Sequence, residues 1–147
     1  MREVYPENQA RMNEYFKPLA QWTDAIQNDF AARADWCIKT YEDANHPPIV
    51  KLAHSIMQTV EPGSIINLSA KGTTDPDGDK LNYKWWQYEA AGTYKGNIEI
   101  QNAESSDASF TLPSDNINGE TIHIICEVTD DGTPSLTRYQ RVVIEIE

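Results

Sequence analysis

The chain has 147 residues, which is enough for one domain with a sizeable core and too few for two large domains. It carries 23 acidic residues against 12 basic ones, and this net charge of -11 argues against binding to nucleic-acid phosphates or an anionic membrane. No run is apolar enough to cross a bilayer, and the N-terminus lacks the apolar segment of a signal peptide. We expect an extracellular or periplasmic protein whose export signal lies upstream of this sequence.

The first predicted element is a helix between Pro18 and Lys39. Proline is tolerated in the first turn of a helix, where its missing N–H has no intrahelical partner to lose. Apolar residues recur at helical spacing and form one stripe: Leu19, Trp22, Ile26, Phe30, Ala34 and Cys37. Pro47 and Pro48 then end any helix. We expect residues 1–44 to form a helical segment and residues 45–147 to form a separate domain.

From Asn45 onward the sequence contains strand-length runs separated by glycine and proline turns. The predicted strands are Ile49–Leu52, Ser64–Ala70, Leu81–Glu89, Ile98–Gln101, Ala108–Leu112, Thr121–Thr129 and Leu136–Glu145. Short strands of this number with turns between them are typical of a β-sandwich. We predict a mainly β protein, an immunoglobulin-like sandwich of about seven strands with the N-terminal α-helix packed on it.

The loop before the third predicted strand is rich in aspartate. Asp75, Asp77 and Asp79 occupy every second position, with Pro76 and Gly78 between them. Proline fixes its own φ and glycine permits a φ that other residues resist, so this loop can direct several carboxylates to one point. Calcium prefers oxygen ligands in such an arrangement.

Two more segments offer oxygen ligands at the same end of the predicted sandwich. One is the loop with Asp130 and Asp131, and the other is the linker with Asn45. If the fold is immunoglobulin-like, these residues converge on the aspartate loop, and calcium would relieve the repulsion between the carboxylates. The alternative is a solvent-exposed turn whose aspartates cap backbone amides. The spacing does not match an EF-hand loop, because no glutamate falls at the position of its bidentate ligand.

The third predicted strand carries alternating aromatic residues. Trp85 is predicted to face the core, and Trp86 and Tyr88 to lie on the outer face of the sheet. In the Thr121–Thr129 strand, Ile124, Cys126 and Val128 are predicted inward, with His123, Ile125 and Glu127 outward.

An outer face with Trp86, Tyr88 and Ile125 is too apolar for a bare surface. Flat aromatic side chains can stack on the apolar faces of sugar rings, which favours carbohydrate binding. Alternatively, the N-terminal helix covers this face with Trp22, Ile26 and Phe30. Tyr94, in a glycine-flanked loop, is a second candidate for sugar stacking.

No recognised catalytic motif is present, neither a nucleophile elbow, nor a zinc-protease helix, nor a glycine-rich phosphate loop. We interpret His46 as a linker residue and His123 as an outward strand residue. Cys37 and Cys126 lie far apart in different kinds of segment, so we interpret them as unpaired. We therefore expect a non-catalytic chain.

One bacterial family resembles this chain in four segments, WTDAIQNDFAARADWC, YEDANHPP, TTDPDGDKLNYKWWQYEAAGTY and IHIICEVTDDGTPSLTRYQRVV. These are cellulose-binding proteins with a nucleoside-hydrolase-like domain followed by a C-terminal immunoglobulin-like domain. The resemblance extends over most of the chain from about Trp22 onward. The combination of segments is specific, whereas DPDGD alone recurs in many cadherin-like and PKD-like modules.

The resemblance implies that this chain is the C-terminal part of a longer protein, with its helix as the tail of the hydrolase-like domain. The aspartate cluster that holds calcium in true nucleoside hydrolases has no counterpart here, so catalytic activity does not carry over. The implied function is binding to cellulose or a related glycan, with Trp86, Tyr88 and Tyr94 as stacking residues. One alternative is a structural domain that braces the hydrolase-like domain. Another is a fragment that helps to shape the site of a glycosyl or ribosyl hydrolase.

Overall fold

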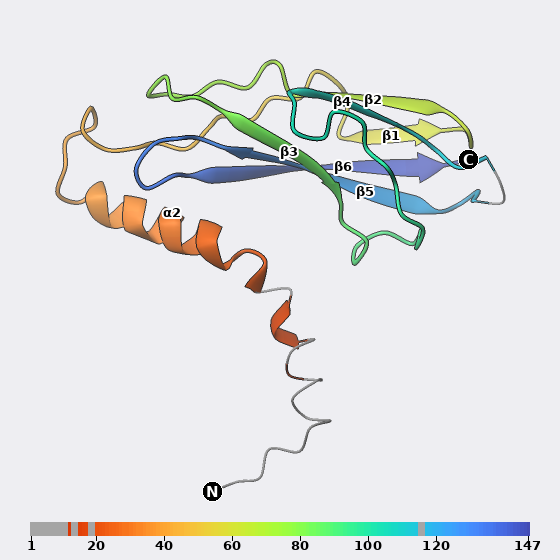
Figure 1. Ribbon diagram of the computed structural model, residues 1–147, viewed down its shortest axis with the longest axis horizontal. Coiled ribbons are helices and arrows are strands. Elements are labelled where there is room, and N and C mark those ends of the chain that lie inside the picture. The colour runs from red at the N-terminus through yellow and green to blue at the C-terminus, as the bar shows by residue number, and fades with distance from the viewer. Residues whose placement is uncertain (1–11, 13–14, 18–19, 115–116) are drawn as a thin grey trace, which may run out of the picture.

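Two β-sheets packed face to face, with one helix outside them, make up the architecture of this protein (Figure 1). The computed structural model describes residues 12, 15–17, 20–114 and 117–147. Pro18 and Leu19, which the sequence places at the start of the helix, lie outside the described residues. Within the described residues, no helix has the length and apolar character needed to cross a membrane.

The larger sheet has four strands and the smaller sheet has two. The spatial order of the larger sheet is β1 (Met57–Val60), β6 (Thr137–Ile146), β5 (Thr121–Thr129) and β3 (Asn82–Gln87), and the smaller sheet pairs β2 (Ile65–Ser69) with β4 (Asp107–Thr111). β1 runs parallel to β6, and the other pairs are antiparallel. The predicted immunoglobulin-like sandwich with an N-terminal helix is therefore confirmed.

The core lies between the two sheets and follows the period of two expected of half-buried strands. In β5, the predicted inward residues Ile124, Cys126 and Val128 are fully buried, and Trp85 in β3 is 2% exposed. Leu68 and Phe110 face them from the smaller sheet. Both cysteines are free, and burial raises the pKa of the Cys126 thiol to about 12. Cys126 thus acts as a small apolar core residue.

Two predicted strands are wrong, and one strand was not predicted. Ile49–Leu52 contributes one isolated bridge, from Ile49 to Thr74, and Ile98–Gln101 contributes one, from Gln101 to Ser109. The pair Pro47-Pro48 lacks the N–H groups that a ladder needs, which restricts pairing before Ile49. β1 was missed because its partner, β6, lies far along the chain and its own four residues carry little pattern.

The helix α2 (Thr23–Asp35) lies against the outer face of the larger sheet (Figure 1). The buried and half-buried residues that form its contact face recur every three or four positions and lie beside the predicted apolar stripe, sharing Trp22 with it: Trp22, Ala25, Asp29, Ala32 and Trp36. Ala32 is buried, and Asp29 forms an ion pair with Arg138 of β6 at 3.1 Å.

The prediction that Ile26 and Phe30 cover the sheet is wrong, because their side chains are 59% and 74% exposed. The hydrophobic pattern favoured the larger apolar residues, whereas small alanines and one ion pair allow the closer approach of helix to sheet. The helix therefore presents an apolar row to the outside.

Candidate functional site

Three segments that are distant in sequence meet at one end of the sandwich, at the left of Figure 1. They are the linker after α2, the loop between β2 and β3, and the loop between β5 and β6. The backbone N–H of His46 donates to Asp77 Oδ2 at 2.6 Å, and the N–H of Lys80 donates to Asp131 Oδ1 at 2.8 Å. We call this region, formed by residues 45–46, 75–80 and 130–132, the acidic end. The structure thus brings the six oxygen-bearing residues singled out in the sequence to one end of the sandwich, and among their carboxylates those of Asp75, Asp77 and Asp79 form a close group.

Within the β2–β3 loop, one carboxylate organises the backbone around it. Asp75 Oδ1 accepts hydrogen bonds from the N–H groups of Asp77, at 2.9 Å, and Asp79, at 3.2 Å. Gly78 has a φ of +83°, a conformation that residues with a side chain rarely adopt. The result is that Asp75, Asp77 and Asp79 offer carboxylate oxygens that all lie within 4.8 Å of one another.

Asp130 organises the β5–β6 loop in the same manner and is 2% exposed. Its Oδ1 atom accepts from Asn45 Nδ2 at 3.1 Å, from the N–H of Gly132 at 3.1 Å and from the N–H of Leu136 at 2.9 Å. Asn45 Nδ2 also donates to the Pro134 carbonyl at 2.8 Å. A Cβ atom at position 132 would collide with the Asn45 amide, so glycine is required there. This network fastens the linker to the sandwich.

His46 has a role at this end that the sequence did not indicate. Its Nδ1 atom lies 3.0 Å from Asp77 Oδ1, so both Asp77 oxygens contact the same residue. Its ring stacks on Trp36, with centroids 5.8 Å apart, and on Tyr41, with centroids 3.9 Å apart. His46 is therefore a positioning residue for Asp77 and not a plain linker residue. The pairing depends on contacts across the fold, which no local sequence signal reveals.

The carboxylates of the acidic end are crowded. Burial raises the pKa of the Asp79 carboxyl above its usual range, and the negative charges of Asp75, Asp131, Asp130 and Asp77 raise it further. Among the ion pairs of the described residues, the only one in this cluster joins Asp77 to His46. The repulsion is therefore not balanced by a neighbouring lysine or arginine.

A second cluster, of aromatic rings, lies on the outer face of the larger sheet. Trp22 contacts Trp86, Tyr88 and Tyr139, with centroid distances of 5.7, 6.3 and 4.7 Å. Trp86 and Tyr88 lie 5.8 Å apart at an interplanar angle of 74°, so they do not form a flat platform. Trp86 Nε1 donates to Glu127 at 3.1 Å. One ring of the N-terminal segment thus covers part of this face, as the packing alternative expected.

The rest of Trp86 and Tyr88 borders a groove of about 500 Å³. We call it the aromatic groove, and its lining comprises Lys17, Gln21, Trp86, Gln87, Tyr88, Glu89, Ala90 and Lys95. Gln87 and Lys95 are engaged with the loop after β3: Gln87 Nε2 donates to the Gly96 carbonyl, and Lys95 Nζ donates to the Gly92 carbonyl. Lys17, Gln21 and Glu89 are the remaining polar groups that could bind a ligand.

Tyr94, the third aromatic candidate, is placed differently. Its ring lies over Gly96, where a Cβ atom would collide with it, and it packs against the core. It does not line the aromatic groove. Its position is that of a residue that closes the end of the core.

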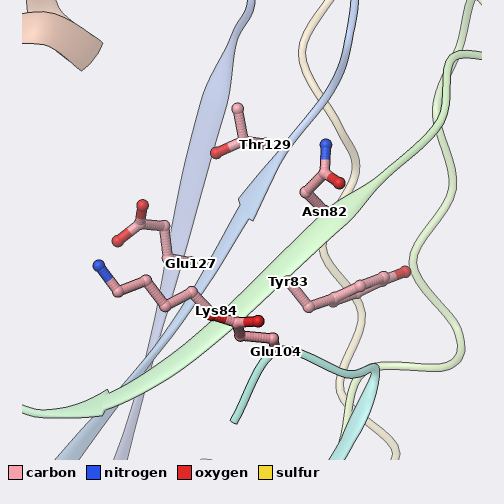
Figure 2. A pocket seen from close by; sticks show the side chains of 6 residues that line it. All are labelled: Asn82, Tyr83, Lys84, Glu104, Glu127 and Thr129. Atoms are coloured by element: carbon pink, nitrogen blue, oxygen red, sulfur yellow. The ribbon is translucent and has the colours of Figure 1, made fainter.

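A further hollow of about 350 Å³ lies along the first half of β3. Its lining residues are Asn82, Tyr83, Lys84, Glu104, Glu127 and Thr129, shown in Figure 2. The Tyr83 ring is directed to the opposite side of β3 from the Lys84 side chain. Tyr83 is the one aromatic residue among its described lining residues, whereas two aromatic rings line the aromatic groove, so the aromatic groove is the better candidate for a sugar.

Comparison with known proteins shows which family this chain is similar to. The model of the family described as cellulose-binding protein Sde0182, C-terminal domain, matches residues 65–146, which is more than half of the chain. No curated protein matches.

Among solved structures, one similar protein is a nucleoside hydrolase-related hypothetical protein from Saccharophagus degradans that is associated with carbohydrate metabolism. It is 41% identical with a TM-score of 0.83, and the match covers 86% of this chain and 32% of that one. This chain thus spans about a third of that relative. The PKD domain of the KIAA 1837 protein is 17% identical with a TM-score of 0.46, and the match covers 67% of this chain and 89% of that one. Murine CRIg is 15% identical with a TM-score of 0.41, and the match covers 69% of this chain and 99% of that one.

Proposed function

Because this chain belongs to the family of the C-terminal domain of cellulose-binding protein Sde0182, we propose that it is a non-catalytic module that binds polysaccharide. In this proposal it acts beside a nucleoside-hydrolase-like domain of the same polypeptide, which supplies any chemistry. A module that binds cellulose or a related glycan works where the glycan is, which is outside the cell or in the periplasm. The observation that carries the proposal is the aromatic groove.

The groove combines the two features that a sugar needs. Trp86 and Tyr88 present apolar rings at its wall, and Lys17, Gln21 and Glu89 present groups that can hydrogen-bond to hydroxyls. Because the rings are tilted at 74° to each other, they would contact a glycan chain from two directions and not as one flat platform. Trp22 supports Trp86 from behind, so the ring is held in place before the ligand arrives.

We expect the chain to be depleted from solution by insoluble cellulose, and Trp86→Ala to weaken retention by about 30-fold, since a central aromatic contact contributes roughly 2 kcal/mol. Depletion isotherms of the parent and of the Trp86→Ala and Tyr88→Ala variants measure this. Phe30→Ala is the matched control, because it removes a more exposed ring outside the groove. Tyr94→Ala tests the loop candidate.

Two results would contradict sugar binding in the groove. One is that the parent chain is not depleted by insoluble cellulose and does not bind soluble glycans. The other is an equal loss with Phe30→Ala and Trp86→Ala, which would indicate general adhesion of aromatic rings. Circular dichroism of each variant establishes that the fold is intact.

The exposed row of α2 favours a second candidate function, that of a brace. Ile26 and Phe30 are exposed, and so is Ile38 after the helix, at 82%. The solved relative is about three times as long as this chain, so its remaining part provides a natural cover for such a row. The brace and the glycan module use different faces of the molecule and are compatible.

We expect Phe30→Ser to leave the stability of the isolated chain within about 0.5 kcal/mol of the parent, because the ring makes few contacts there. In a polypeptide that also carries the hydrolase-like domain, the same change should lower the melting temperature of the domain pair. Gln27→Ser, an exposed polar neighbour on the same helix, is the control. Equal melting of both variants in the longer protein would exclude this row as the domain contact.

A further inference from the structure

Three buried oxygen atoms at the acidic end have no hydrogen-bond partner: Asn45 Oδ1, Asp75 Oδ2 and Asp130 Oδ2. Asn45 is 8% exposed and Asp130 is 2% exposed. Each of these side chains uses its other polar atom to hold a loop, and leaves this oxygen without a donor. A buried acceptor without a partner is costly, and the cost is larger for an ionised carboxylate. An oxygen-seeking cation would remove that cost.

The capped-turn interpretation of these aspartates accounts for some of the oxygens. Asp75 Oδ1 and Asp130 Oδ1 accept N–H groups two residues ahead, as in ordinary Asx turns, and Asp131 Oδ1 accepts the N–H of Lys80 from another loop. It does not account for Asp75 Oδ2, Asp130 Oδ2 or Asn45 Oδ1. These three come from three different segments, and the segments are tied together by the Asn45–Asp130 and His46–Asp77 contacts.

We propose that the acidic end is a calcium site built on Asp75, Asp77 and Asp79, whose carboxylate oxygens lie within 4.8 Å of one another, with the unpartnered Asn45 Oδ1 and Asp130 Oδ2 as further ligands from the other two segments. Asp131 adds negative charge at its exposed side. Calcium takes six to eight oxygen ligands from carboxylates, amides and water in a flexible arrangement, which suits a set assembled from three loops. Zinc prefers nitrogen or sulfur, and the one imidazole here is engaged with Asp77.

The position of the site gives the ion a structural consequence. Asn45 and His46 belong to the linker that follows α2, whereas Asp75 and Asp130 belong to the sandwich. Calcium bound between them would fix the linker, and with it the direction in which α2 leaves the domain. The proposed calcium site shares no residue with the aromatic groove, so the proposal stands whether or not the chain binds glycan.

The test is the melting temperature of the chain after treatment with chelator, measured as free calcium rises from about 1 µM to about 10 mM, a range that includes extracellular calcium modules. Because the folded state alone would hold the complete site, we expect a rise of about 5 °C or more at saturation. Isothermal titration of CaCl₂ should give one site per chain.

Asp79→Asn is the informative variant, because its carboxylate receives no hydrogen bond among the described contacts and its side chain is retained in size. It should be at least as stable as the parent in chelator, because the change removes one of the crowded charges, and it should lose most of the calcium response. Asp24→Asn, at the opposite end of α2 from the linker, should keep the full response. An unchanged melting temperature over the whole range, a full response in Asp79→Asn, or an equal response to magnesium would each overturn the proposal.

Discussion

Replacing Trp85 by alanine is expected to lower the free energy of unfolding by about 3–5 kcal/mol. The Trp85 ring lies in the core between the two sheets, 2% exposed, and its Nε1 donates to the Ser105 carbonyl at 2.9 Å. Alanine would leave a cavity and a carbonyl without its donor, and rigid sheets on both sides limit the collapse that could fill the space. Urea denaturation followed by circular dichroism measures the change.

The neighbouring Trp86 is the matched control for this prediction. It has the same side chain on the same strand, but on the outer face, where Trp22 and Tyr88 cover it in part. We expect Trp86→Ala to cost about 1–2 kcal/mol, because less surface is buried and solvent can enter the space. Equal costs for the two tryptophans would mean that the inward and outward faces of β3 have been assigned wrongly.

Much of the sandwich could be predicted because its long strands carry their own pattern. In β5, Ile124, Cys126 and Val128 alternate with His123, Ile125 and Glu127, and this alternation indicates the inward face even though Ile125 on the outer side is also buried. β1 has no such pattern and exists because β6 offers a parallel partner along Val143–Ile146. Pairing of this kind is decided by residues far along the chain, so local inspection does not find it.

The orientation of α2 shows a different limit. Of the predicted stripe, Trp22 contacts the sheet, yet Ile26 and Phe30 are exposed and an adjacent row that includes Ala32 faces the sheet. Ala32 permits close approach, and Trp22 and the Asp29–Arg138 ion pair join this face to the sheet. A hydrophobic pattern identifies a face that needs covering, but it does not say which part of a protein covers it.

The acidic end was easier to anticipate than the aromatic groove. Its carboxylates sit in turns whose ends are fixed by the sandwich topology, so the fold alone places them together. The contribution of His46 could not be anticipated, because it depends on stacking with Trp36 and Tyr41. The groove depends on Lys17 and Gln21 lying beside Trp86 and Tyr88, which no motif specifies.

Asp130→Ala is expected to destabilise the chain by about 3–4 kcal/mol in the presence of chelator. The change removes one acceptor from three donors, namely Asn45 Nδ2 and the N–H groups of Gly132 and Leu136, and leaves them in a region where water has little access. Because Asn45 belongs to the linker, the loss should also loosen the segment between α2 and the sandwich. Hydrogen exchange of the Gly132 and Leu136 amides would report the opening directly.

Asp130→Asn separates the two roles of this residue. It keeps an oxygen at the Oδ1 position, so most of the stability lost in Asp130→Ala should return when both are measured in chelator. It also removes the charge and replaces the free Oδ2 atom by an amide group, which cannot bind a cation. A stable Asp130→Asn protein is therefore expected to lack the calcium response. If Asp130→Ala costs less than about 1 kcal/mol in chelator, the carboxylate does not organise the loop as the hydrogen bonds indicate.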